Sequence, residues 1–142
     1  MAITQAVCNT FKSELLGAVH DFDSGSGQVF KLALYTSAAN LSAATTIYTA
    51  TGEVANSGQY TATGGILLSQ TVSLDGSVGI VDFADLSFTG VTLTARGALI
   101  YNTSASSKSV CVLDFGADKT ATSGTFTIVF PANTSAAAIL RI

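Results

Sequence analysis

The sequence predicts a mainly β protein, a single antiparallel β-sandwich or barrel-like domain over residues 1–142 with one N-terminal α-helix. Apolar and polar residues alternate over 91–102, which is the period of a strand with one apolar face. Segments 110–115 and 125–130 are apolar, lack a helical period, and are bounded by Gly, Ser, Asn or Pro. One helix followed by several short strands is typical of a helix laid against a sandwich or barrel.

The N-terminal helix is expected over residues 3–22, where apolar residues recur at every fourth position, with Thr4 as N-cap. This apolar stripe includes Phe11 and must be covered, either by a sheet of the same chain or by a neighbouring molecule. Phe11 is therefore a candidate partner contact. His20, the only histidine, falls at the expected helix end, where the helix dipole favours a cation, so we interpret it as a cap and not as a catalytic base.

Residues 37–65, after an expected strand at 28–36, are predicted to form a long contact loop. The segment is rich in Ala, Ser, Thr and Gly, with at most a helical turn around 42–46 and an edge strand near 47–48. Its few large apolar groups are too few to offset roughly 1–2 kcal/mol of backbone entropy per ordered residue, so we expect its order to depend on a partner. Ile47, Tyr48 and Tyr60 are the side chains expected to contact that partner.

Residues 66–142 are predicted to form the β core. Asp75-Gly76 indicates a two-residue hairpin between strands at 67–74 and 77–83. Further strands are expected at 86–88, 91–102, 109–115 and 125–130, with turns at 103–107 and 116–124. The apolar end, 138–142, is expected to be a strand docked in a sheet, as in a rigid building block.

Composition excludes several classes of function. With 48% hydrophobic and 11% charged residues, the chain can bury a sizeable core. A net charge of −3 and the lack of a Lys/Arg cluster argue against binding nucleic acid. No apolar run approaches the roughly 20 residues that span a bilayer, and the N-terminus does not resemble a signal peptide, so we expect neither membrane insertion nor export. The Thr- and Ser-rich surface fits either β propensity or a face that lies against neighbours.

The sequence contains no pattern that points to a catalytic or cofactor-binding residue. The glycine-rich pieces lack the features of a phosphate loop, a dinucleotide fingerprint or a nucleophile elbow. Two aspartate pairs, Asp82 with Asp85 and Asp114 with Asp118, could place Ca²⁺ at a sheet rim, but aspartates beside turns more often bond to the backbone. We therefore predict no metal and no cofactor.

Arg96 and the two cysteines each allow two interpretations. Arg96, inside a strand of Thr and apolar residues, is expected to pair with a carboxylate of this chain, or else to reach a neighbouring subunit. Cys8 and Cys111 have no metal-like spacing and are expected to be reduced core residues, with a disulfide as the alternative.

Most of the chain resembles a group of small virion structural proteins of tailed bacteriophages. The resemblance lies in ARGALIYN (95–102), in the segments 110–133 and 138–142, and in FKLALYTSAANLSAATTIYTATGEV (30–54). It implies a non-enzymatic capsid decoration (cement) protein, made in the host bacterial cytoplasm and bound outside the head to the major capsid protein. The apolar helix and the charge-poor segment 37–65 offer more apolar surface than one small sheet covers, so we expect a homo-oligomer. The analogy with cement proteins favours a trimer.

Other functions remain open at this point. The chain could be a tail, neck or head-fibre attachment subunit, because the resembling segments contain no residue that separates these positions. A carbohydrate-binding β-sandwich would require tyrosines such as Tyr48, Tyr60 or Tyr101 to line an open groove. A metal-assisted hydrolase would require one of the aspartate pairs to hold a metal.

Overall fold

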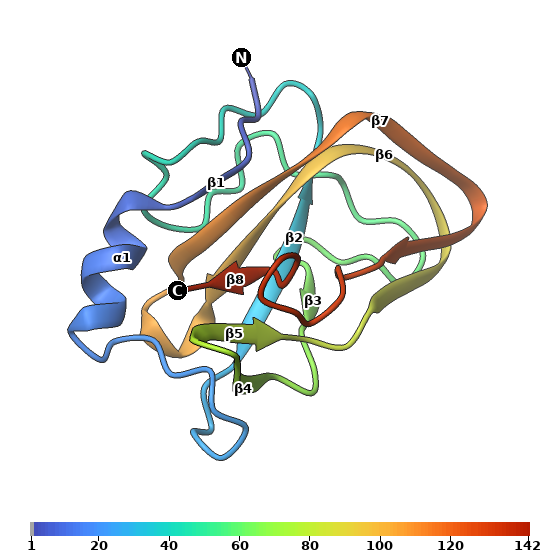
Figure 1. Cartoon of the computed structure of the whole chain (residues 1–142). Coiled ribbons are helices and arrows are strands. Elements are labelled where there is room, and N and C mark those ends of the chain that lie inside the picture. Colours follow the sequence, from blue (N-terminus) through green and yellow to red (C-terminus); the bar gives the residue numbers. More distant parts are fainter. Residues whose placement is uncertain (1) are drawn as a thin grey trace.

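Two antiparallel sheets pack against each other in a sandwich-like arrangement in the computed structural model, which describes residues 2–142 (Figure 1). One sheet has the order β1-β7-β6-β2-β3, and the other has the order β4-β5-β8. The sheets do not close into a barrel, so the sandwich form of the predicted fold class is confirmed. The elements are β1 (Ala6–Val7), α1 (Asn9–Leu16), β2 (Phe30–Tyr35), β3 (Gly65–Ile66), β4 (Thr71–Asp75), β5 (Val78–Asp82), β6 (Leu86–Asn102), the 3₁₀-helix η1 (Thr103–Ala105), β7 (Lys108–Ile128) and β8 (Leu140–Arg141).

The N-terminal helix is much shorter than predicted. Residues 6–7 are extended and pair with Val112 and Cys111 of β7, and Cys8, not Thr4, is the N-cap. The helix ends at Leu16, and Ala18 has a φ of 60°, which no α-helix accommodates. Of the apolar residues spaced by four, Ile3 and Phe11 are buried in the core, whereas Val7 in β1 is 36% exposed, so the spacing does not mark the face of one helix.

β6 and β7 form one long curved ribbon (Figure 1). The predicted turn at 116–124 is wrong, because β7 runs unbroken through it and pairs with β6 as far as Leu86↔Ile128. Register shifts interrupt the pairing, and Gly116 and Ser123 have positive φ values of 79° and 45°. Glycine and serine at these positions suggested a turn from the sequence. In the structure they belong to an irregular part of the strand, and such irregularities bend a strand without ending it.

The core lies between β2, the β6–β7 ribbon and the second sheet. β2 is buried on both faces, as its sequence predicts. Phe22, from the segment after α1, stacks on Phe30 of β2 with ring centroids 4.4 Å apart, and Phe83 contacts both rings edge-on or tilted. Such aromatic pairs join the helical end of the molecule to both sheets.

The predicted hairpin and the predicted C-terminal strand are both present. Asp75 pairs with Val78 around a loop of Gly76 and Ser77, one residue later than the dipeptide suggests, and Gly76 has the positive φ of 62° that favours glycine there. β8 pairs with β5, and Ile142 and Gly79 exchange two hydrogen bonds of 2.9 and 2.8 Å.

The two cysteines are free and buried, in agreement with the prediction. Burial raises the pKa of both thiols, that of Cys111 to about 12, so both remain protonated near neutral pH. Within residues 2–142, the helices are too short and too polar to cross a membrane.

Candidate functional site

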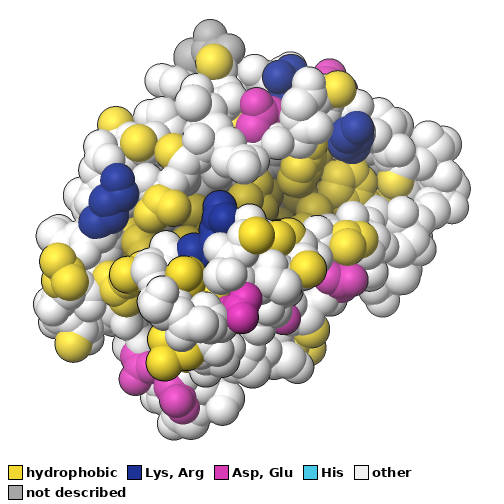
Figure 2. Space-filling view, viewed as in Figure 1, with side chains coloured by type: hydrophobic (Ala, Val, Ile, Leu, Met, Phe, Trp, Pro, Cys, Tyr) yellow, Lys and Arg dark blue, Asp and Glu magenta, His cyan; other side chains and the backbone are white. Residues whose placement is uncertain are grey.

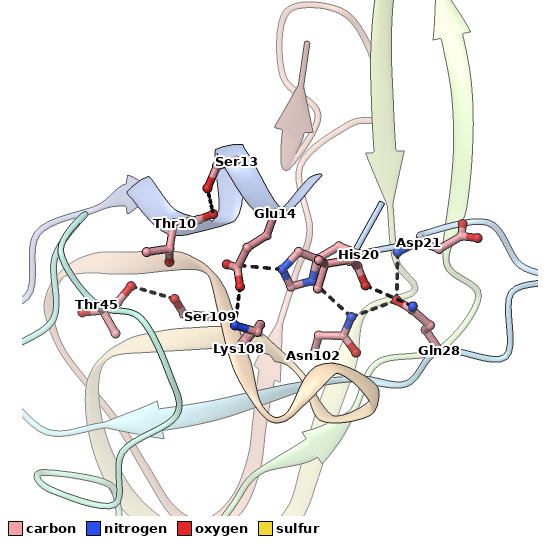
Figure 3. Close-up of polar contacts among 11 residues, drawn as sticks. Thr10, Ser13, Glu14, His20, Asp21, Gln28, Thr45, Asn102, Lys108 and Ser109 are labelled. Carbon is pink, nitrogen blue, oxygen red and sulfur yellow. Dashed lines mark hydrogen bonds and ion pairs between the residues drawn. The ribbon is translucent and has the colours of Figure 1, made fainter. Parts of the chain in front are cut away.

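A partly buried polar cluster surrounds the buried His20 (Figure 3). His20 is 4% exposed, and its Nδ1 lies 3.1 Å from Nδ2 of Asn102, which also donates to Oε1 of Gln28 at 2.8 Å. Because an amide NH₂ group only donates, Nδ1 accepts and the imidazole proton is assigned to Nε2. We call Glu14, His20, Gln28, Asn102 and Lys108 the His20 cluster.

The other imidazole nitrogen faces Glu14. His20 Nε2 lies 3.7 Å from Glu14 Oε1, and Lys108 Nζ lies 2.9 Å from Glu14 Oε2. Burial lowers the pKa of His20 and outweighs the opposing charge of Glu14. Burial acts to raise the pKa of Glu14, but the hydrogen bond and charge of Lys108 hold it below its ordinary value. His20 is therefore neutral near pH 7.

The His20 cluster fastens the segment after α1 to the β6–β7 ribbon. Gln28 accepts from the backbone N–H of Asp21 at 2.8 Å and donates to the carbonyl of Val19 at 3.2 Å. The prediction that His20 caps a helix is wrong, because it lies beyond Leu16 and turns inward. Its neighbours are a carboxylate, an amide and the ring of Phe11, which suit a structural role.

Two of the four aspartates considered as metal ligands accept hydrogen bonds from the backbone. Asp85 accepts the N–H of Phe130 at 2.9 Å, and Asp114 accepts from Gly116 N at 2.9 Å. In the described part of the chain, no three His, Cys, Asp or Glu side chains gather as a metal site would require.

Arg96 forms the internal ion pair that the sequence favoured. Its Nε lies 3.1 Å from Asp114 Oδ1, with 35% and 26% of the two side chains exposed. The pair spans β6 and β7 near the surface, where such pairs contribute about 0–1 kcal/mol.

The predicted contact loop is packed into the molecule. Tyr60 is fully buried, and its hydroxyl accepts the N–H of Leu34 at 2.9 Å. Leu41 and Val54, 1% and 5% exposed, join the same core. The expectation that this segment lacks internal anchors is therefore wrong, and Tyr60 offers no exposed surface to a partner. Phe11 is also buried, at 3% exposed.

Glu53 is the anchor that the sequence reasoning missed. Its carboxylate accepts the Tyr48 hydroxyl at 2.6 Å and the Thr63 N–H at 2.8 Å, and the Tyr60 hydroxyl lies 3.4 Å away. Burial, with help from Glu53, raises the pKa of Tyr48, so the phenol remains a donor. A signal was present, because Glu53 is the only charged residue of 37–64 and lies between two tyrosines.

Ile47 and Tyr48, the other two loop residues predicted to contact a partner, differ in exposure. Ile47 is 51% exposed, and Tyr48 is half-buried against Tyr101, with ring centroids 5.0 Å apart. Because Tyr60 and Tyr101 are buried, they do not line the open groove that a carbohydrate-binding site would need.

Two apolar hollows lie on either side of β8, and Figure 2 shows apolar side chains lining the depressions of this face. The β7 hollow, of about 540 Å³, is lined by Gln5, Leu113–Phe115, Lys119–Ala121, Thr125–Pro131 and Ile139. The α1 hollow, of about 520 Å³, is lined by Val7, Phe11, Lys12, Leu15, Leu16, His20–Phe22, Val72, Gly79–Val81 and Leu140–Ile142. The sequence could not reveal them, because each is assembled from segments far apart in the chain.

Several large apolar side chains remain exposed around these hollows. Val129 beside the β7 hollow is 72% exposed, and Leu16 and Ile142 at the α1 hollow are 90% and 80% exposed. Exposed apolar side chains that border a hollow are typical of places where another molecule binds. Comparison with protein-family models, with curated proteins and with solved structures finds no match to this chain.

Proposed function

We propose that this chain is a non-enzymatic structural protein of a tailed-phage virion that decorates the outside of the head. It is made in the host cytoplasm, assembles as a homo-oligomer, and contacts the major capsid protein. The observation that carries the proposal is the β7 hollow with the exposed Val129 at its rim. The segments that resemble virion proteins, 95–102 and 110–133, belong largely to the β6–β7 ribbon that forms this hollow.

The chemistry of this surface suits a permanent contact. Burying apolar area gains about 25 cal/mol per Å², and a chain with 11% charged residues has few ions to desolvate around the contact. The charged groups lining the β7 hollow are Asp114, which is paired with Arg96, and Lys119. A partner with an apolar projection, and with an acidic group opposite the exposed Lys119, could fill the hollow without leaving a charge unpaired.

The rigidity of the molecule supports the same role. The His20 cluster fixes the segment after α1, and Glu53 fixes the loop 37–64. A surface that is ordered before binding loses little conformational entropy on assembly.

The test is incorporation into particles. Phage carrying Val129→Lys should contain at least about tenfold less of the chain than wild type, since each tenfold step corresponds to about 1.4 kcal/mol and a buried lysine costs more than that. Ile66→Lys, at a 49% exposed site on β3 away from the hollow, is the matched control and should be incorporated normally. Thermal unfolding should show that both variants fold.

Separating heads from tails on a gradient decides the location. The proposal expects the chain in the head fraction. Recovery with tails would replace head decoration by the tail or fibre-attachment role, and absence from all particles would overturn the proposal. Normal incorporation of the Val129→Lys variant would show that the β7 hollow is not the contact.

A further inference from the structure

The strand β4 has a free edge. Gly79 and Ile142 exchange two hydrogen bonds, so the backbone groups of Gly79 and Val81 point toward β8. Val78, Ile80 and Asp82 therefore point toward β4, where they pair with Asp75, Ser73 and Thr71. By the same alternation, the N–H and C=O groups of Val72 and Leu74 point away from the sheet, where β4 is the terminal strand.

The side chains of β4 do not include the prolines and lysines that commonly keep an edge strand from pairing with another strand. All five β4 residues are exposed, with Val72 at 54% and Leu74 at 76% on one face beside the α1 hollow. The strand contains no proline or lysine, and its one charge, Asp75, accepts the N–H of Ser135 at 2.6 Å. An edge strand with exposed apolar residues and without proline or lysine is a template for another strand.

We propose that β4 pairs antiparallel with β4 of a second copy of this chain, about a two-fold axis through Ser73. Val72 then lies opposite Leu74 of the partner subunit, and the outward N–H and C=O groups of these residues form the new hydrogen bonds. On the other face, Thr71 lies opposite Asp75 of the partner subunit, which places a hydroxyl donor beside a carboxylate. The backbone groups and side chains of β4 thus complement those of a second β4 strand, so we take the partner at this edge to be a second copy of the chain.

Other registers of the same pairing are less favourable. An axis through Asp75 would place two carboxylates opposite each other. An axis through Thr71 would leave Leu74 unpaired, because Ser69, with a φ of 56°, ends the extended run before β4. The register through Ser73 is the one that covers both apolar side chains.

The pairing joins two three-stranded sheets into one of six strands and places the two α1 hollows beside each other. Because the two-fold pairing uses the same strand of both subunits, no free β4 edge remains for a third subunit. The pairing therefore predicts a dimer and not the trimer that the analogy with cement proteins favours. The contact uses neither Val129 nor the β7 hollow. Its failure would leave the proposed head contact standing, and the reverse also holds.

The mass of the chain in solution tests the dimer. Sedimentation equilibrium over a range from about 1 to 500 μM should show a shift from 14.4 kDa to twice that mass, with a micromolar midpoint because the interface is small. Leu74→Lys should weaken the dimer at least tenfold, whereas Leu68→Lys, at a 64% exposed leucine outside β4, should not. Val72→Pro removes only an outward N–H and should act like Leu74→Lys while thermal unfolding shows a folded monomer.

A cysteine on the axis gives an independent measurement. Ser73→Cys should form a disulfide-linked dimer under mild oxidation. The two Ser73 residues would form a non-hydrogen-bonded antiparallel pair, in which the Cα atoms lie about 4.5 Å apart, within the range of a disulfide. Ser77→Cys, equally exposed in the adjacent loop, should not, and the native cysteines are buried. A monomer at all concentrations without the Ser73→Cys cross-link, or equal cross-linking at position 77, would overturn the proposal. So would a dimer or trimer that survives the Leu74→Lys and Val72→Pro changes.

Discussion

The Tyr48 hydroxyl donates to Glu53 Oε1 at 2.6 Å, within the segment whose composition suggested a free arm. The same carboxylate accepts the Thr63 N–H at 2.8 Å, so one residue ties both halves of the loop together. Tyr60 is buried in the core, and its hydroxyl accepts the N–H of Leu34, which links the loop to β2. These polar contacts add to the apolar anchoring by Leu41, Val54 and Tyr60, which are buried in the core.

Replacing Glu53 by Gln should destabilise the protein by about 1–3 kcal/mol, because the new amide NH₂ faces donors that it cannot satisfy. Urea unfolding measures this change. Asp118→Asn, an exposed carboxylate on β7, is the control and should change stability by less than about 0.5 kcal/mol. Equal stability of wild type and Glu53→Gln would mean that Glu53 does not anchor the loop.

Deleting residues 50–58 should unfold the whole domain. The deletion removes Glu53 and the buried Val54, and it withdraws the chain that positions Tyr60. Loss of chemical-shift dispersion in a one-dimensional NMR spectrum would show this outcome. A dispersed spectrum would restore the view of 37–65 as a separate arm.

Gly58→Ala should cost about 2–5 kcal/mol, the sum of a left-handed backbone penalty and overpacking. Gly58 has a φ of 52°, and a Cβ there would collide with the backbone carbonyl of Gly90 in the β6 bulge. Gly27→Ala is the matched control, since Gly27 has a φ of 74° but open space around it, and it should cost only about 1–2 kcal/mol. Equal thermal shifts for the two variants would contradict the close packing of loop and ribbon.

Stability should fall as the pH drops below about 6.5, the ordinary pKa of histidine. The pKa of folded His20 is lowered, so the unfolded chain takes up the proton first, and the stabilisation present above pH 6.5 declines toward the folded pKa. Urea midpoints between pH 5 and 8 measure the trend, above the range in which Glu14, with an ordinary pKa of 4.5, titrates. His20→Gln should flatten the profile, and an unchanged slope in that variant would assign the trend to another group.

Periodicity predicted the fold class well because alternation is local. The hairpin with its loop at Gly76-Ser77 and the buried β2 follow from residues adjacent in the sequence. The failures have non-local causes: β1 is extended because it pairs with β7, and 116–124 continues a strand because β6 lies beside it. The inward turn of His20 depends on Asn102, which is 82 residues away. The two hollows, being built from distant segments, were beyond sequence reasoning.

We propose that the chain is a virion component bound outside the head. Cryo-electron microscopy of phage particles with and without the gene tests it most directly. We expect additional density on the outer surface of the shell in wild-type particles, fitted by this fold with the β7 hollow against the capsid protein. Identical density in the two kinds of particle, with the chain missing from the purified virions by mass spectrometry, would contradict it.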